Sequence, residues 1–139
     1  GSALVANAVK YVTRVLNIKA ARNKHIASLT GSTYQINPSV KGIRRPITVY
    51  HGVDESEPKI YENLDMAGYT CIESDYLYKD FSGALTVGDF VVFDNVGSYS
   101  VVMKPPFILP DIPVLELSED EEEVVKRGQT PEDVFAYYN

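Results

Sequence analysis

Short runs of β-branched and aromatic residues, each ended by glycine or proline, recur along this chain and constrain its fold more than any other feature. Runs of this composition are typical of strands, and the residues between them favour turns. We expect strands at about residues 9–18, 25–29, 47–51, 59–71 with a break at Gly68, 89–93 and 96–103. Gly83 and Gly88 are expected to flank a turn, and Pro105-Pro106 to end the ladder, because proline donates no backbone hydrogen bond. The pattern predicts an all-β domain, either a β-barrel or a sandwich.

The end of the chain has a different pattern, which predicts a helix. Thr130 is a favourable N-cap before Pro131, and Glu132 and Asp133 follow in the first turn, where acids meet the positive end of the helix dipole. An apolar face is then formed by Val134, Phe135 and Tyr138. We therefore expect a short terminal helix over residues 131–138.

Length and charge limit the classes of function. The 139 residues suit a single domain with its own core. No apolar run approaches the roughly 20 residues that cross a membrane, and no signal-peptide pattern opens the chain, so we expect no membrane association. The net charge of −6 disfavours nucleic acid, because a phosphate-binding surface needs clustered cations. The acidic run at residues 118–123 is expected to be a solvated surface.

Cysteine and histidine are scarce. The single cysteine, Cys71, excludes an intrachain disulfide and suits a reducing compartment, so we expect a cytoplasmic protein. The two histidines, His25 and His51, stand in no HExxH pattern, and CxxC spacing is absent. We therefore expect no metal site.

Three segments follow one another in an order typical of a known family. The first combines residues 3–8 with 12–15; the second is 68–75, GYTCIESD; the third joins 87–89 to 94–99, with Phe107 beyond. A weaker match covers residues 124–127 and 130–133. Together they resemble the fold-type III pyridoxal-phosphate-dependent decarboxylases, which include ornithine, diaminopimelate, arginine and carboxynorspermidine decarboxylases.

The resemblance implies a fold and a cofactor. The whole chain, residues 1–139, would be the C-terminal domain of a two-domain decarboxylase, a Greek-key-like β-barrel with a short C-terminal helix. The cofactor would be pyridoxal 5′-phosphate, whose ring takes up the electrons released when CO₂ leaves an amino-acid substrate. The barrel domain that binds the cofactor and carries its lysine is absent from this chain. The resemblance thus implies an inactive fragment whose partners are that N-terminal domain and a second copy in a homodimer.

The resemblance also implies roles for individual residues. Cys71 would donate the proton to the α-carbon in the neighbouring subunit's active site. A thiol suits this task, because its ordinary pKa of about 8.5 keeps it mostly protonated at neutral pH yet able to release a proton. Tyr99 would bind the cofactor phosphate through its hydroxyl, and Phe107 would line the site. Asp75 and Asp89 are expected to satisfy turn amides rather than to take part in the reaction.

One departure from the family bears on the substrate. Family members that act on diamino acids have an acid directly after the cysteine, where it meets the distal ammonium; here that position is Ile72, and Glu73 follows. In a strand adjacent side chains face opposite ways, so Glu73 is not an automatic substitute. The stretch at residues 37–41 also lacks the arginine and tyrosine of diaminopimelate enzymes. We therefore expect a larger or differently charged amino-acid derivative, as in polyamine-like or siderophore-type biosynthesis, in place of ornithine, lysine or diaminopimelate.

Two other functions remain open at this stage. The chain could be a stand-alone β-barrel module that binds a partner or a small ligand, or the fold-related C-terminal domain of a racemase, although the segment around Cys71 disfavours the racemase. An exposed apolar, aromatic-rich surface near Cys71 and Tyr99 would favour the decarboxylase domain, since such a surface would face the missing domain and second subunit.

Overall fold

The computed structural model describes residues 2–36, 44–52 and 58–138 of the chain. The chain divides between Lys104 and Pro105 into two compact units. The first unit begins with two helical turns, α1 (Ser2–Val5) and η1 (Ala6–Ala8), and contains one more after its second strand, η2 (Thr33–Gln35). Its strands are β1 (Tyr11–Ala21), β2 (Lys24–Leu29), β3 (Ile47–Tyr50), β4 (Lys59–Ala67), β5 (Tyr76–Leu85) and β6 (Phe90–Phe93). The stretch at residues 37–41, used in the substrate prediction, lies outside the described residues.

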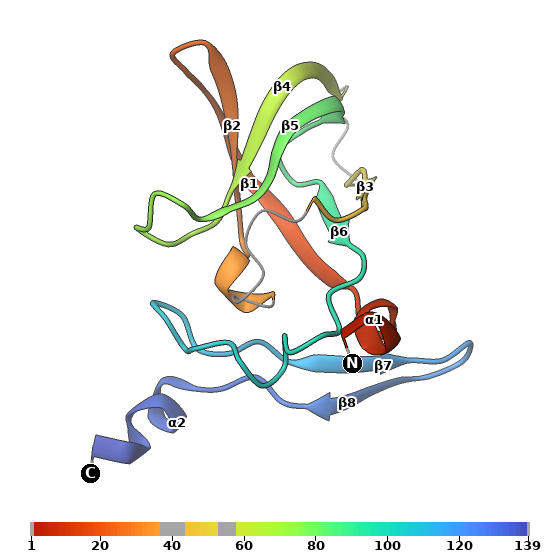
Figure 1. Cartoon of the computed structure of the whole chain (residues 1–139), viewed down its shortest axis with the longest axis vertical. Helices are drawn as coiled ribbons and strands as arrows, with labels where there is room; N and C mark the ends of the chain where they lie inside the picture. Colours follow the sequence, from red (N-terminus) through yellow and green to blue (C-terminus); the bar gives the residue numbers. More distant parts are fainter. Residues whose placement is uncertain (1, 37–43, 53–57, 139) are drawn as a thin grey trace. The chain divides into compact units, whose positions relative to one another are not determined.

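These strands form one sheet in the order β3-β6-β1-β2-β4-β5. Neighbouring strands are antiparallel except β2 and β4, which run parallel. The sheet curls into a nearly closed barrel (Figure 1). This barrel, with the short C-terminal helix described below, confirms the predicted mainly β fold.

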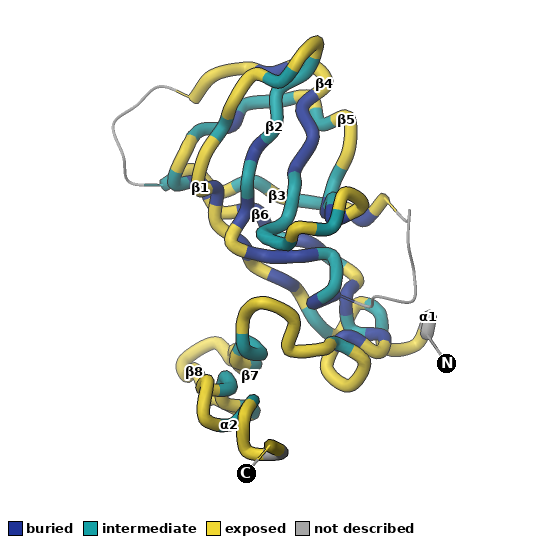
Figure 2. The backbone as a smooth tube through the Cα atoms, turned by 90° about the vertical axis from the view of Figure 1, so that its left-hand side faces the viewer, coloured by how far each residue is buried: buried dark blue, intermediate teal, exposed yellow. Residues whose placement is uncertain are grey.

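Alternation along β1 explains how the sequence forms the barrel wall. Tyr11, Thr13 and Val15 are buried, whereas Val12 and Arg14 between them are exposed, as a strand with one face on the core requires. Strands β2, β4, β5 and β6 contribute large, fully buried side chains to the same core, among them Leu29, Leu64, Met66, Leu85 and Phe93. Figure 2 shows the buried stretches concentrated on these strands.

Two predicted strands need correction. The strand expected at residues 96–103 is wrong, because the chain turns there: the Tyr99 carbonyl accepts hydrogen bonds from the amides of Val102 (3.3 Å) and Met103 (2.9 Å). The strand expected at residues 59–71 ends at Ala67. Its last four predicted residues belong to a loop, which Gly68 begins.

Strand β5 was not predicted, because Gly83 was expected at a turn. Instead Gly83 lies within β5 with a φ of 155°, and a Cβ there would stand 2.9 Å from the Phe81 ring. The glycine therefore makes room for an aromatic ring inside the strand. Gly88 does lie in the turn between β5 and β6, with a φ of 97°.

The second unit contains a hairpin of β7 (Val114–Leu117) and β8 (Glu122–Lys126). In the turn between them the Ser118 amide donates to the Glu121 carbonyl (3.0 Å), and the Glu121 amide donates to the Ser118 hydroxyl (3.1 Å). Residues 118–123 are all exposed, which confirms the predicted solvated surface. The hairpin itself was not predicted.

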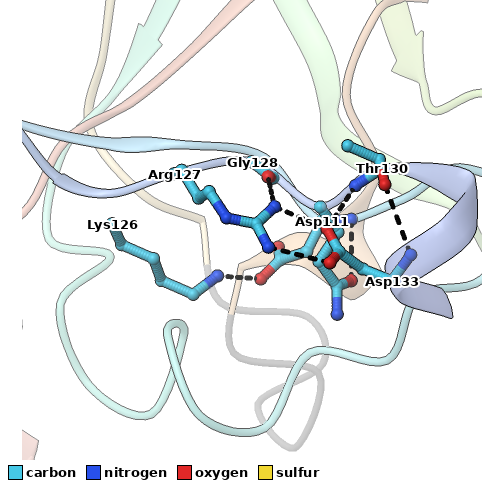
Figure 3. Close-up of polar contacts among 7 residues, drawn as sticks. Asp111, Lys126, Arg127, Gly128, Thr130 and Asp133 are labelled. Atoms are coloured by element: carbon cyan, nitrogen blue, oxygen red, sulfur yellow. Dashed lines mark hydrogen bonds and ion pairs between the residues drawn. The ribbon is translucent and has the colours of Figure 1, made fainter. Parts of the chain in front are cut away.

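The terminal helix is confirmed as α2 (Pro131–Phe135), followed by the turn η3 (Ala136–Tyr138). Thr130 caps it: its hydroxyl accepts the Asp133 amide (3.3 Å), and the Asp133 carboxylate accepts the Thr130 amide (2.8 Å). Arg127 pairs with the same carboxylate, and Lys126 with Asp111 (Figure 3). The weakly matching sequence around residues 127–133 thus forms a capped helix start.

Acidification from about pH 5 to about pH 2 is expected to loosen the start of α2. Arg127, together with the Thr130 amide, holds the pKa of Asp133 well below its ordinary value of 3.8. Because the folded carboxyl has the lower pKa, its stabilising contribution is present above 3.8 and is lost as the pH falls through the folded value. Hydrogen exchange of the Val134 amide, measured across this range, should show the loss, and Asp133→Asn should flatten the response. A response of equal size in Asp133→Asn would contradict the assignment.

Candidate functional site

Cys71 lies on the loop at residues 68–75, between β4 and β5, and is exposed. The ends of the loop meet where the Gly68 amide donates to the Asp75 carbonyl (2.8 Å). Within the loop the Asp75 amide donates to the Ile72 carbonyl (2.9 Å), which turns the chain directly after the cysteine. The cysteine is therefore open to solvent on a loop whose backbone is closed by hydrogen bonds.

The carboxylate of Asp75 organises this loop from inside. It is 3% exposed. One oxygen accepts the Thr70 amide (3.1 Å), the Thr70 hydroxyl (2.6 Å) and the Ser32 hydroxyl (2.9 Å). The other accepts the Thr33 amide (2.8 Å). Gly68 needs to lack a side chain here, because a Cβ would stand 2.2 Å from the carboxylate. Asp75 satisfies turn donors, as predicted, and also joins the loop to η2.

Tyr11 continues this network into the barrel wall. Its hydroxyl donates to the Gln35 side-chain carbonyl and accepts the Ser32 amide (3.3 Å). The same Gln35 oxygen accepts the Ser32 amide (3.2 Å). Burial raises the pKa of Tyr11 well above its ordinary value, so the phenol stays protonated and keeps its donor role. The Cys71 loop is thereby connected to β1 through Ser32.

Ile72 and Glu73 follow Cys71 on the loop rather than on a strand. The alternation of side chains along a strand, on which the substrate prediction relied, therefore does not apply to them. Ile72 is half-buried and Glu73 is exposed. The Ile72 amide donates to the Thr70 hydroxyl (3.4 Å), so its backbone belongs to the Asp75 network. The predicted substrate contacts of both side chains stay predictions.

Tyr99 lies in the turn after β6, with a φ of 60° and 51% of its surface exposed. The Ser100 hydroxyl donates to the Val96 carbonyl, which holds the turn together with the amide bonds to the Tyr99 carbonyl described above. A positive φ is uncommon outside glycine, and residues in such conformations cluster at functional sites. The turn therefore fixes an exposed tyrosine in an unusual backbone conformation.

Gly97 connects this turn to the start of the chain. Its amide donates to the Ala6 carbonyl (2.9 Å), and the Val96 amide donates to the Val9 carbonyl (3.2 Å). A Cβ on Gly97 would stand 2.0 Å from the Val5 carbonyl oxygen, so only glycine permits this approach. The segment that precedes β1 thus fixes the turn that carries Tyr99.

Asp89 holds the turn between β5 and β6 by accepting hydrogen bonds, as Asp75 does in the Cys71 loop. It is fully buried, and its carboxylate accepts the amides of Gly52 (3.1 Å) and Thr86 (2.8 Å) and pairs with the His51 ring (3.0 Å). Asp89 therefore satisfies turn amides, as predicted.

The structure brings only some of the predicted site residues together. Cys71, Ile72 and Glu73 share one loop, and Tyr99 lies in a separate turn of the same unit. Phe107 belongs to the second unit, where it is exposed. Sequence reasoning missed Ser32 and Thr70, which hold Asp75. The capping pattern of Ser32 with Gln35, three residues later, was the available signal for the first of them.

The described residues contain no group of three or more His, Cys, Asp or Glu side chains placed to hold a metal ion. In the same part of the chain, no helix is long and apolar enough to cross a membrane.

Residues 4–97 match the family model described as "Pyridoxal-dependent decarboxylase, C-terminal sheet domain". The chain belongs to this family. The match covers the first unit up to the turn of Gly97 and confirms the resemblance drawn from the sequence. Among the three functional interpretations, the match supports a decarboxylase domain.

Relatives of this sheet domain include several diaminopimelate decarboxylases. The enzyme of Buchnera aphidicola is 26% identical over 147 residues, which cover 97% of this chain and 35% of that protein. A probable chloroplastic diaminopimelate decarboxylase of rice is 26% identical and covers 100% of this chain and 29% of its own length. The structure of Helicobacter pylori diaminopimelate decarboxylase complexed with L-lysine superposes with a TM-score of 0.82 at 26% identity, over 99% of this chain and 34% of that one. The chain thus spans about a third of the length of these relatives.

Proposed function

We propose that this chain is the C-terminal domain of a pyridoxal-phosphate-dependent amino-acid decarboxylase and that Cys71 donates the proton that replaces CO₂ on the substrate's α-carbon. The observation that carries the proposal is an exposed thiol on a loop held by a buried carboxylate, in a chain of this family. The carbon–carboxylate bond breaks first, and CO₂ leaves its electron pair behind; the thiol then gives its proton to the α-carbon, and the thiolate regains a proton from water.

The residues of this chain fit part of the cofactor. When bound, pyridoxal phosphate supplies an acceptor for the electron pair that CO₂ leaves behind. The exposed hydroxyl of Tyr99 is a neutral donor that suits one phosphate oxygen. One neutral donor does not balance the phosphate charge, so the cationic and amide partners of that phosphate come from the N-terminal domain in this proposal.

An exposed apolar segment at residues 99–103 supports contact with another domain or subunit. Tyr99, Val101, Val102 and Met103 are all exposed in the first unit. Neighbouring exposed apolar side chains of this kind mark surfaces that contact another protein segment. We assign this segment to contact with the N-terminal domain or the second subunit of a homodimer. Near Cys71 the corresponding surface is smaller, since Ile72 and Tyr69 are half-buried.

The substrate in this proposal is an amino acid whose distal end is not a bare ammonium ion. The half-buried Ile72 offers an apolar contact beside the thiol, and a distal ammonium placed there would lose hydration without gaining a charge partner. Diaminopimelate is the second candidate, because the curated relatives carry that name. CO₂ release from diaminopimelate, ornithine, lysine, arginine and N-substituted diamino acids distinguishes the two. Preference for ornithine, lysine or diaminopimelate would overturn the first.

The domain assignment has its own test. The 139-residue chain, supplied with pyridoxal phosphate, should release no CO₂ from any of these amino acids. Mixing it with a separately expressed N-terminal domain should restore turnover. Turnover by the chain alone would overturn the assignment, and two well-folded parts that fail to associate would favour a stand-alone module.

Tyr99→Phe in the full-length enzyme is expected to weaken cofactor binding by about tenfold, the effect of losing one hydrogen bond to a charged oxygen. The ring and the backbone turn are retained, so the melting temperature of the cofactor-free enzyme should not change. Titration with pyridoxal phosphate, followed by its absorbance, gives the dissociation constant. Tyr50→Phe, on another exposed tyrosine of the same unit, is the control. Equal dissociation constants for Tyr99→Phe and Tyr50→Phe would refute the phosphate contact.

A further inference from the structure

We propose that Asp75, acting through Thr70, is a positioning residue that holds Cys71 in place for proton transfer. This inference rests on the proposed function of Cys71 and adds the part of the chain that fixes its geometry. Neither Asp75 nor Thr70 needs to touch the substrate for this role.

Both neighbours of Cys71 along the chain are held by Asp75. On one side, Thr70 donates its amide (3.1 Å) and its hydroxyl (2.6 Å) to the Asp75 carboxylate. On the other side, the Ile72 carbonyl accepts the Asp75 amide (2.9 Å). The Ile72 amide also donates to the Thr70 hydroxyl (3.4 Å), so this hydroxyl links the two sides. The position of Cys71 therefore depends on one carboxylate and one hydroxyl.

The anchor is rigid because Asp75 is itself buried and bonded to a second segment. At 3% exposure its carboxylate has little contact with water, and the Ser32 hydroxyl and Thr33 amide fix it from η2. Hydrogen bonds in a low-dielectric interior are strong, and unsatisfied groups there are costly. In an asparagine at this position only one of the two terminal atoms accepts hydrogen bonds. Its NH₂ group would therefore face one set of donors, and those hydrogen bonds would be lost.

A substitution of Asp89 serves as the control that distinguishes a positioning role of Asp75 from general support of the fold. Asp89 is a fully buried carboxylate that accepts the amides of Gly52 and Thr86 in the same unit, yet neither segment contains Cys71. Asp75→Asn and Asp89→Asn should both lower the melting temperature. At a temperature where both variants are folded, only Asp75→Asn should lower kcat.

The sharpest variants are at Thr70 in the full-length enzyme. Thr70→Val keeps the shape of the side chain but removes the hydroxyl, and is expected to lower kcat by about 10- to 100-fold with KM little changed, the effect of misplacing a reacting group by about 1 Å. Thr70→Ser keeps the hydroxyl and should restore most of the rate. Independently of activity, hydrogen exchange of the peptide at residues 68–76 should be faster in Thr70→Val and unchanged in the β1–β2 hairpin.

A double-mutant cycle with Cys71→Ala decides the matter. If Thr70 acts by positioning the thiol, Thr70→Val causes no further loss of kcat once the thiol is gone. An equal further loss in that background would overturn the inference, as would an unchanged kcat in Thr70→Val alone. If Cys71→Ala itself leaves kcat unchanged, the proposed function of the thiol fails instead, and the inference that rests on it falls too.

Discussion

Replacing Cys71 with alanine in the full-length enzyme is expected to lower kcat by about 100- to 10,000-fold, the contribution of a positioned general acid. The residue is exposed, and its side chain is small, so the fold and the binding of cofactor should change little. Release of CO₂ and of the product amine, with the cofactor titrated separately, measures both effects.

Ser74→Ala is the matched control on the same loop. Ser74 is exposed, and its hydroxyl lies 3.5 Å from that of Tyr34, at the limit of a hydrogen bond. This variant should keep the rate of the unaltered enzyme. A Cys71→Ala variant that also keeps it would show that another group donates the proton.

Gly97→Ala is expected to destabilise the first unit by about 1–3 kcal/mol, the usual cost of forcing an extra carbon into a packed site. The added Cβ would stand 2.0 Å from the Val5 carbonyl oxygen, so the segment before β1 has to move away. The bond from the Gly97 amide to the Ala6 carbonyl is then lost as well. The melting temperature should fall by roughly 4–8 °C for each kcal/mol.

Gly52→Ala is the control for Gly97→Ala. It tests whether the loss of stability comes from the close approach of Gly97 to Val5 or from replacing a glycine with alanine in general. A Cβ on Gly52 would meet its nearest neighbouring atom, the Gly88 carbonyl oxygen, at 3.2 Å, which a small shift accommodates. Its melting temperature should therefore fall much less than that of Gly97→Ala. Equal losses would contradict the assigned contact with Val5.

The sequence pattern predicted strands correctly where their side chains pack on the core, and failed where apolar side chains are exposed. The β-branched run at residues 11–18 became part of β1, and its first half shows the alternation: residues 11, 13 and 15 are buried. The equally β-rich run at residues 96–103 became a turn, and its exposed Val101, Val102 and Met103 are the side chains assigned to a partner surface. Composition alone does not distinguish an apolar strand from an apolar contact surface.

The missed elements have local causes. In β5 the backbone takes a positive φ at Asp80, which pairs with Lys24, and bends again at Gly83, so the alternation of a regular strand is interrupted. In β8 the first residues, Glu122 and Glu123, are acidic and exposed, a composition typical of a loop.

The candidate site was partly visible in the sequence. Cys71 and Tyr99 could be named from flanking residues, and the turn role of Asp75 followed from its residue type. The partner that fixes Asp75 could not be named, because Ser32 lies 43 positions away, and the strands that precede the two segments, β2 and β4, pair in parallel. Contacts of this kind depend on the sheet order, which local patterns do not contain.

In the Cys71 loop, the residues that hold the backbone differ from those whose side chains are free of polar contacts within the described part of the chain. Thr70 and Asp75 make the side-chain bonds that hold the loop, whereas the side chains of Ile72 and Glu73 make no polar contact with the described residues. If these two side chains meet the substrate, as proposed, substitutions at 72 and 73 change that contact and leave the support of the thiol intact. Under the proposed function, a lineage of such domains can shift its preferred amino acid by single substitutions without passing through a form that fails to protonate its product.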